Sequence, residues 1–172
     1  MSTDSHTLNI IGSTEYVEIA GVKNIPAKID TGADSSAIWA SDINISEDGA
    51  LIFCLFDQKS PLYTGKKLKT RDFAAKMVRS SHGDTEVRYR VKLKLKIASK
   101  SFETNFTLAN RSRNKFPVLI GRRTLHKKGF IVDVSKSSVA RQKPKTSVSV
   151  ELNQELKKNP HEFHQKYIKG VE

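Results

Sequence analysis

An acidic turn follows a strand-like run near the start of the sequence. The run Ile25–Ile29 leads into Asp30-Thr31-Gly32-Ala33, and about ninety residues later comes the segment Pro117–Arg122, which reads PVLIGR. Two carboxylates held close together cannot both ionise, so one can act as a base toward water while the other acts as an acid toward a carbonyl. The acidic turn therefore predicts hydrolysis by general acid–base chemistry, provided that a second carboxylate is at hand.

The second carboxylate has to come from elsewhere, because the chain holds no other Asp-Thr-Gly or Asp-Ser-Gly turn. We therefore predict a homodimer with twofold symmetry, in which Asp30 of each subunit faces the other across the axis. Gly32 is expected to let the backbone turn tightly beside the carboxylate, and the Thr31 hydroxyl to tie the loop to its symmetry mate. Asp30, Thr31 and Gly32 are thus the predicted catalytic residues.

The two segments together resemble the active-site half of a retropepsin-like aspartic protease. Four further runs narrow this resemblance to one bacterial family: Val78–Gly83, Glu86–Tyr89, Thr107–Arg111 and Ile131–Asp133. With them, residues 10 to 138 are similar to the bacterial retropepsin-like family that carries the name ATP-dependent zinc proteases. The resemblance implies an aspartic peptidase, an association with ATP-grasp ligases that add glutamates to a ribosomal protein, and trimming of such tails by some members.

The resemblance also implies which residues lie near the substrate. In that family a hairpin after the first half of the domain acts as a flap over the cleft. The substrate-binding residues implied here are Ala33, Arg79, Ser81, His82, Glu86 and Arg88. For the side chains at the hairpin tip, a solvated loop is an equally good interpretation.

The chain departs from the family pattern just after the acidic turn. Members commonly carry a basic residue and then a histidine where this chain has Asp34 and Trp39. Asp34 matches retroviral proteases better, in which it pairs with the arginine of the Gly-Arg segment. We therefore predict an Asp34–Arg122 ion pair that, with Gly121, supports the active-site loop. For Trp39, packing in the core is favoured over lining a subsite because of its size.

The net charge of +12 is concentrated in one stretch of the chain. Between Lys59 and Lys100, thirteen lysines and arginines stand against three acidic residues, which favours a polyanionic partner. Alternation in Val91–Ile97 also predicts lysines that simply point outward from a solvated sheet face. The charge alone does not choose among nucleic acid, a membrane surface and an acidic peptide; the family resemblance implies an acidic peptide or protein as substrate. Nucleic acid is disfavoured because aromatic residues are not interleaved with the lysines.

Short strands with turn signals predict a mostly β protein, a small closed retropepsin-like (acid protease) β barrel with one short helix. A flexible N-terminus is expected at 1–9, the barrel domain at 10–138, and a basic polar tail at 139–172 with room for helices at 151–158 and 161–168. The helix of the barrel is expected at 119–127. Strands are expected at 16–20, 26–29, 35–41, 51–57, 69–80, 86–98, 101–109 and 130–134.

Several classes of protein are disfavoured by what the sequence lacks. No apolar run approaches the length that crosses a bilayer, so we expect no membrane partner and a cytoplasmic location. There is no HExxH or paired Cys-x-x-Cys, and the five histidines show no ligand spacing, so we expect no metal and no other cofactor. Cys54, in an apolar run, is expected to be a buried structural thiol.

These observations leave a leading function and its alternatives. The leading function is a homodimeric aspartic peptidase that cleaves acidic or glutamate-rich peptides, and the alternative is a non-catalytic retropepsin-like module that binds acidic peptides. A nucleic-acid binder is the third candidate. An ordinary turn at Asp30–Gly32 is disfavoured, because the apolar strand and the distant Gly-Arg segment would have to coincide with it.

Overall fold

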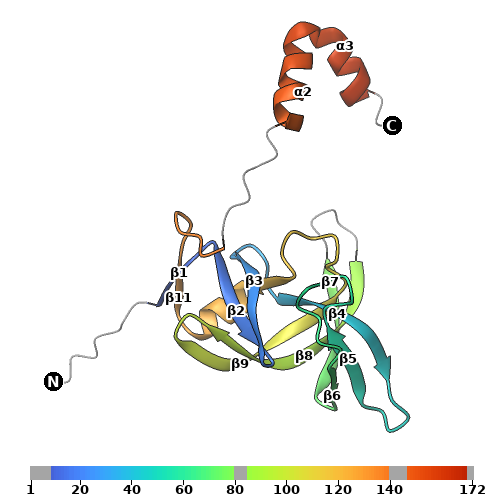
Figure 1. Ribbon diagram of the computed structural model, residues 1–172, viewed down its shortest axis with the longest axis vertical. Helices are drawn as coiled ribbons and strands as arrows, with labels where there is room; N and C mark the ends of the chain where they lie inside the picture. Colours follow the sequence, from blue (N-terminus) through green and yellow to red (C-terminus); the bar gives the residue numbers. More distant parts are fainter. Residues whose placement is uncertain (1–8, 80–84, 140–146, 170–172) are drawn as a thin grey trace, which may run out of the picture. The chain divides into compact units, whose positions relative to one another are not determined.

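The computed structural model describes residues 9–79, 85–139 and 147–169. The chain divides into two compact units, Met1–Val139 and Ala140–Glu172 (Figure 1). The first unit contains one helix, α1 (Arg122–Lys127), among its described residues. Its strands are β1 (Asn9–Gly12), β2 (Thr14–Ile19), β3 (Val22–Asp30), β4 (Ser36–Ile45), β5 (Leu51–Leu55), β6 (Lys67–Thr70), β7 (Phe73–Arg79), β8 (Thr85–Ile97), β9 (Lys100–Ala109), β10 (Val118–Gly121) and β11 (Phe130–Asp133).

Six of the described strands close into a barrel. The hydrogen-bonded order runs β10-β3-β2-β8-β9-β4, and β4 pairs in turn with β10, which completes the ring. Most neighbours are antiparallel, whereas β10–β3 and β4–β9 are parallel. The predicted mostly β, closed retropepsin-like barrel with one short helix is confirmed.

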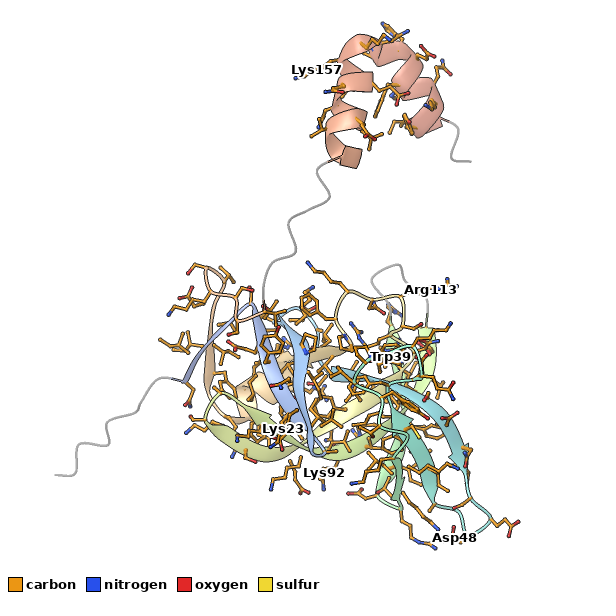
Figure 2. The ribbon with its side chains drawn as sticks, in the orientation of Figure 1. Lys23, Trp39, Asp48, Lys92, Arg113 and Lys157 are labelled. Carbon is orange, nitrogen blue, oxygen red and sulfur yellow. The ribbon has the colours of Figure 1, made fainter. Side chains whose placement is uncertain are left out.

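The barrel interior follows from the alternation of apolar residues along the strands. In β8, Val91, Leu93, Leu95 and Ile97 are buried, while the lysines between them are exposed. Lys92, which Figure 2 shows on the outside of the barrel, pairs with Asp72 at 3.3 Å. The interpretation of this run as a solvated sheet face is therefore confirmed for these lysines.

The two apolar residues singled out in the sequence both lie in the core. Trp39, labelled in Figure 2, is buried. It packs edge to face against Phe56, with ring centroids 6.2 Å apart. Cys54 is a buried free thiol. Core packing of Trp39 and burial of the Cys54 thiol are thus confirmed.

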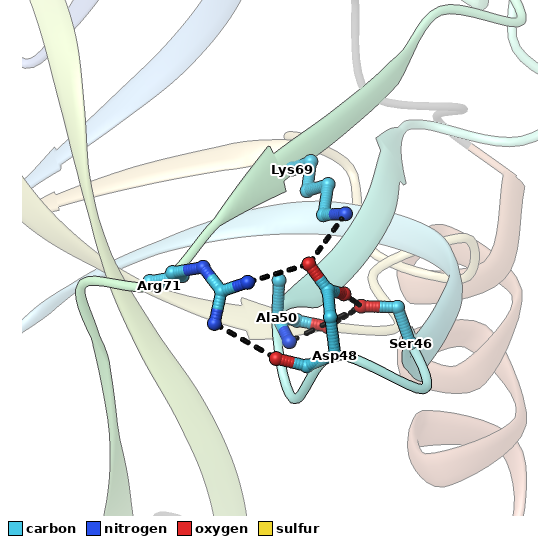
Figure 3. Close-up of polar contacts among 5 residues, drawn as sticks. All are labelled: Ser46, Asp48, Ala50, Lys69 and Arg71. Carbon is cyan, nitrogen blue, oxygen red and sulfur yellow. Dashed lines mark hydrogen bonds and ion pairs between the residues drawn. The ribbon is translucent and has the colours of Figure 1, made fainter.

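A hairpin of β4, β5 and β6 projects from the barrel, and Asp48 holds its tip (Figures 1 and 3). The Asp48 carboxylate accepts hydrogen bonds from Lys69 at 3.0 Å and Arg71 at 2.6 Å, and a short one from Ser46. These contacts lower the pKa of Asp48, with the Ser46 hydrogen bond as the largest cause and the Lys69 hydrogen bond next. The turn between β4 and β5 is therefore tied to the end of β6.

Three expectations about the strands and the helix need correction. The strand expected at 69–80 is two strands, because a turn at Thr70–Asp72 separates β6 from β7, with Asp72 N donating to Thr70 Oγ1 at 3.0 Å. The helix expected at 119–127 begins only at Arg122, since residues 118–121 form a strand between β3 and β4. Strand β1, which pairs with β11, was not expected at all.

The second unit is helical, with α2 (Ser147–Lys158), α3 (Pro160–His164) and a short π-helical turn η1 (Gln165–Lys169). Asn159 caps α3 by accepting a hydrogen bond from Glu162 N at 3.2 Å, and Pro160 follows at a position that needs no amide donor. Glu155 joins α2 to η1 through Lys166 at 2.7 Å and Tyr167 at 2.9 Å. Within the described ranges, no helix is long and apolar enough to cross a membrane.

Candidate active site

Asp30 is the last residue of β3, and its carboxylate is held by the loop that follows. Oδ1 accepts hydrogen bonds from Gly32 N and Ala33 N, both at 3.2 Å. Oδ2 lies 3.4 Å from the ammonium of Lys28, and the Asp30 side chain remains 26% exposed. One carboxylate oxygen is therefore bound to the loop amides, while the other forms an ion pair with a half-exposed lysine.

Gly121 packs directly against this loop. In the parallel pair of β10 and β3 it stands opposite Asp30. A Cβ at position 121 would lie 2.5 Å from Ser35 C and 2.8 Å from Ala33 O, both backbone atoms. The next residue, Arg122, donates its amide to Ala33 O at 2.7 Å. The Gly-Arg segment thus supports the active-site loop through its backbone, and only glycine fits at 121.

Gly32, unlike Gly121, is exposed and has room for a Cβ atom. A Cβ there would have Asp30 Oδ1 at 3.4 Å as its nearest neighbour, which is an ordinary contact. Its φ lies outside the left-handed region that favours glycine. The turn itself therefore does not require glycine, and the small residue leaves the carboxylate open to solvent.

The predicted ion pair between Asp34 and Arg122 is present. Arg122 Nη2 donates to Asp34 Oδ1 at 2.5 Å. Both side chains are more than half exposed, at 55% for Asp34 and 65% for Arg122. Exposed ion pairs contribute about 0–1 kcal/mol, so the loop is braced mainly by the backbone contacts of Gly121 and Arg122.

A chain of buried hydroxyls, which sequence reasoning missed, lies next to the loop. Ser36 Oγ accepts a hydrogen bond from Gly121 N at 3.0 Å and bonds to Thr124 Oγ1 at 2.7 Å. Thr124 Oγ1 in turn lies 3.1 Å from Thr104 Oγ1. Buried hydroxyls need partners, and these three satisfy one another while joining β4, α1 and β9.

Three of the predicted flap residues lie on described strands: Arg79 ends β7, and Glu86 and Arg88 belong to β8. β7 and β8 form an antiparallel hairpin, with Arg79 opposite Thr85. The Arg79 side chain is exposed and makes no hydrogen bond or ion pair with another described side chain. Glu86 and Arg88 pair with each other at 2.6 Å along β8. The other two predicted contacts, Ser81 and His82, lie outside the described residues.

Arg111, in the loop after β9, interacts electrostatically with Asp30, which sequence reasoning did not predict. Its Nε donates to Phe116 O at 3.1 Å. Burial is the main reason that the pKa of Arg111 is lowered; the charge of Arg88 adds to this, and the charge of Asp30 opposes it. The guanidinium is thus within electrostatic range of both Arg88 on β8 and Asp30 in the acidic turn. Its run, 107–111, supported the family resemblance, but no role was assigned to Arg111.

The chemistry available at this site comes from a carboxylate surrounded by cations. Lys28 and Arg111 both interact with the charge of Asp30. In the part of the chain that the structure describes, no three or more His, Cys, Asp or Glu side chains gather where they could hold a metal ion. A single carboxylate of this kind can take or give a proton, and it can form half of a pair.

Comparison with known proteins identifies the family. Residues 10–143 match the model of the RimB-like family, described as retropepsin-like aspartic endopeptidase RimB. The name of that family refers neither to zinc nor to ATP, so ATP-dependent zinc protease is not a name that this match supports.

Curated relatives carry a different name. A probable alpha-L-glutamate ligase of Shewanella pealeana is 28% identical over 134 residues, which are 74% of this chain and 29% of the relative. One of Desulfotalea psychrophila is 28% identical over 122 residues, 67% of this chain and 26% of the relative. The chain therefore spans less than a third of the length of these relatives.

A solved structure shares the fold. The crystal structure of a protein of unknown function from Legionella pneumophila subsp. pneumophila str. Philadelphia 1 aligns with a TM-score of 0.58 and 23% identity, covering 75% of this chain and 95% of that one. With the match over residues 10–143, the closed barrel and the Asp30 loop beside Gly121, the chain belongs to the RimB-like family of retropepsin-like aspartic endopeptidases.

Proposed function

We propose that the protein is an aspartic peptidase that acts as a homodimer, with Asp30 of two subunits activating one water molecule between them. The observation that carries the proposal is the position of the Asp30 carboxylate. It ends β3, is held by the amides of Gly32 and Ala33, and lies beside the Gly121–Arg122 segment. Its second oxygen, Oδ2, lies 3.4 Å from the Lys28 ammonium.

The chemistry of such a pair needs no covalent intermediate. One carboxylate is ionised and takes a proton from the water as the oxygen of the water attacks the scissile carbonyl. The protonated partner gives its proton to the carbonyl oxygen at the same time. When the tetrahedral gem-diol collapses, the carboxyl group that took the water proton gives it to the leaving nitrogen as the C–N bond breaks, and the other carboxylate takes a proton from a gem-diol hydroxyl, which re-forms a carbonyl. Each Asp30 would serve once as base and once as acid.

The exposed sheet of β1 and β11 supports the assignment of a dimer. Ile10 and Ile131 are register neighbours in this two-stranded sheet and are 47% and 45% exposed. A two-stranded sheet is marginal alone, and its open edges and apolar side chains favour the addition of further strands. A second copy of the chain is the occupant that would also supply the missing carboxylate.

Acidic peptides are the proposed substrates. The charges of Arg88 and Asp30 both act on Arg111, so two cationic side chains belong to the electrostatic surroundings of the acidic turn. Basic surfaces attract acidic chains and raise their local concentration. Two relatives that contain a region similar to this chain are named probable alpha-L-glutamate ligase. Their name supports a substrate that is rich in glutamate.

The test is mass spectrometry of peptides incubated with the protein between about pH 4 and 8, the range in which paired carboxylates titrate. One peptide carries an oligoglutamate tail and the other has glutamines in its place. The variant is Asp30→Asn, and Asp48→Asn is the matched control because Asp48 belongs to the distant hairpin. Cleavage by wild type and Asp48→Asn, but not by Asp30→Asn, is expected. Cleavage by Asp30→Asn would contradict the proposal.

The dimer has a separate test. Ile10→Lys places a charge on the β1–β11 sheet, and Ile45→Lys places one on the projecting hairpin at the same exposure of 47%. In sedimentation velocity, Ile10→Lys is expected to be monomeric and inactive, and Ile45→Lys to match wild type. A dimeric Ile10→Lys would exclude this sheet as the interface.

One observation favours the second candidate, a non-catalytic module that binds acidic peptides. The Lys28 ammonium lies 3.4 Å from Asp30 Oδ2, the carboxylate oxygen that the loop amides leave free. If Lys28 simply neutralises Asp30, the wild-type dimer binds the oligoglutamate peptide without cleaving it, and Lys28→Met weakens binding. In a peptidase, Lys28→Met still cleaves, because the water is activated by the carboxylates.

A further inference from the structure

A cavity of about 140 Å³ lies beside the active-site loop, and its charged lining is entirely cationic. The cations are Lys76 of β7, Arg90 of β8, and Arg123 and Lys127 of α1. No Asp or Glu is among the lining residues, all of which the structure describes. Four positive groups from three elements thus converge on one space without a lining carboxylate to balance them.

The floor of the cavity is polar and buried. It includes the hydroxyls of Ser36, Thr104 and Thr124, which form the chain of hydrogen bonds under the loop. Ser36 Oγ already accepts the amide of Gly121. If the hydroxyl protons run from Ser36 through Thr124, the last hydroxyl, Thr104, has its proton free to donate. The floor can therefore offer a donor that complements the cations above it.

The cations are close enough to repel one another. Lys76 donates a short hydrogen bond to Ser35 Oγ at the edge of the cavity. Burial, followed by the charges of Arg123 and Arg90, lowers the pKa of Lys76, and Asp34 opposes this only in part. Asp34 is itself paired with Arg122. An anion in the cavity would relieve this repulsion, which a neutral molecule would not do.

The size and donors of the cavity match a small oxyanion. Its volume of about 140 Å³ is well above the roughly 10–15 Å³ that a cavity needs to hold one water molecule. Two guanidinium groups provide forked donors that suit the planar or tetrahedral oxygens of carboxylate and phosphate, and the two ammonium groups add point charges. An acidic lining, which a metal cation would need, is missing.

We propose that this cavity is a binding site for a small oxyanion of the carboxylate or phosphate class. Ser35 and Ser36, which line it, follow Asp34 directly, so the bound oxyanion lies next to the active-site loop. The oxyanion can be a carboxylate of an acidic peptide or a free anion in solution. This proposal does not require Asp30 to be catalytic, because Asp30 does not line the cavity and anion binding involves no step of the peptidase reaction.

Isothermal titration calorimetry with inorganic phosphate tests the site in the full chain at constant ionic strength, with chloride as the reference anion. The variants are Arg90→Gln and Lys76→Gln, and the matched control is Arg113→Gln, an exposed arginine that does not line the cavity (Figure 2). Loss of one charge-assisted contact is expected to weaken phosphate binding by about tenfold or more in either variant. The control and Asp30→Asn should bind like wild type.

Two results would overturn the proposal: phosphate that binds wild type no better than chloride, and phosphate that binds wild type, Arg90→Gln and Lys76→Gln equally well. Arg90 is exposed, so its variant should stay folded, and Lys76→Gln removes a partly buried charge that its neighbours repel.

The oligoglutamate peptide then identifies the source of the oxyanion. If the site takes a peptide carboxylate, phosphate displaces the peptide and Arg90→Gln weakens its binding. If the site takes a free anion, peptide and phosphate bind together. Because the readout is binding, failure of the peptidase proposal and failure of this one are distinguishable.

Discussion

Gly121→Ala should damage both stability and the active site, and the structure gives the size of the effect. A Cβ at 121 would lie 2.5 Å from Ser35 C and 2.6 Å from Ser35 O, whereas carbon atoms in contact are about 3.5–4.0 Å apart. The backbone has to move by about 1 Å, since no flexible side chain can yield instead. Strain of this kind costs about 1–3 kcal/mol.

The backbone shift that Gly121→Ala requires would disturb the neighbours of β10 on both of its edges. β10 is bonded to β3 on one edge and to β4 on the other, and Gly121 stands opposite Asp30. Displacement of about 1 Å near a reacting group can cost about 100-fold in rate. We therefore expect a lower free energy of unfolding together with a large loss of any peptidase activity.

Urea unfolding followed by tryptophan fluorescence measures the first effect, because Trp39 is buried in the same barrel. The midpoint should fall with the slope unchanged. Gly32→Ala is the matched control, since its Cβ would meet only Asp30 Oδ1 at 3.4 Å. Equal midpoints for wild type and Gly121→Ala, or an equal loss in both variants, would refute the reasoning.

Three smaller predictions concern other contacts. Asp34→Asn should lower the free energy of unfolding by about 1 kcal/mol or less, as measured in urea, because its ion pair is exposed. Thr124→Val should lower it by about 1–3 kcal/mol, because Ser36 and Thr104 lose a buried partner. Folding lowers the pKa of Asp48 below its usual 3.8, so its stabilising contribution is full above that value and is lost as the pH falls below it. Asp48→Asn should therefore make the unfolding midpoint less sensitive to pH between about 5 and 2; an unchanged pH dependence would contradict the role of the hairpin contacts.

The features that the sequence predicted are those in which neighbouring residues carry the signal. Alternation in β8 reveals its buried face directly, since side chains on a strand alternate between two faces. The Asp34–Arg122 pair was predicted from the two segments that resemble the retropepsin pattern, and it is present. The barrel likewise follows from many short strands with turn signals between them.

The features that were missed depend on residues far apart in the chain. The short apolar run 118–121 is compatible with helix or strand, and only its pairing with β3 and β4 makes it a strand. Ser36, Thr104 and Thr124 look like surface residues until three elements bury them together. Lys28 next to Asp30 was passed over because it was read only as part of a strand.

The central claim is that one active site needs Asp30 from two subunits, and mixing subunits tests it most directly. Wild type is mixed with Asp30→Asn at a fixed total concentration, exchange of subunits is followed by native mass spectrometry, and cleavage of the oligoglutamate peptide is measured. If both carboxylates are needed, activity follows the square of the wild-type fraction, so an equal mixture retains about a quarter of the activity. A linear decline, with about half of the activity in an equal mixture, would place the chemistry within a single chain and contradict the account.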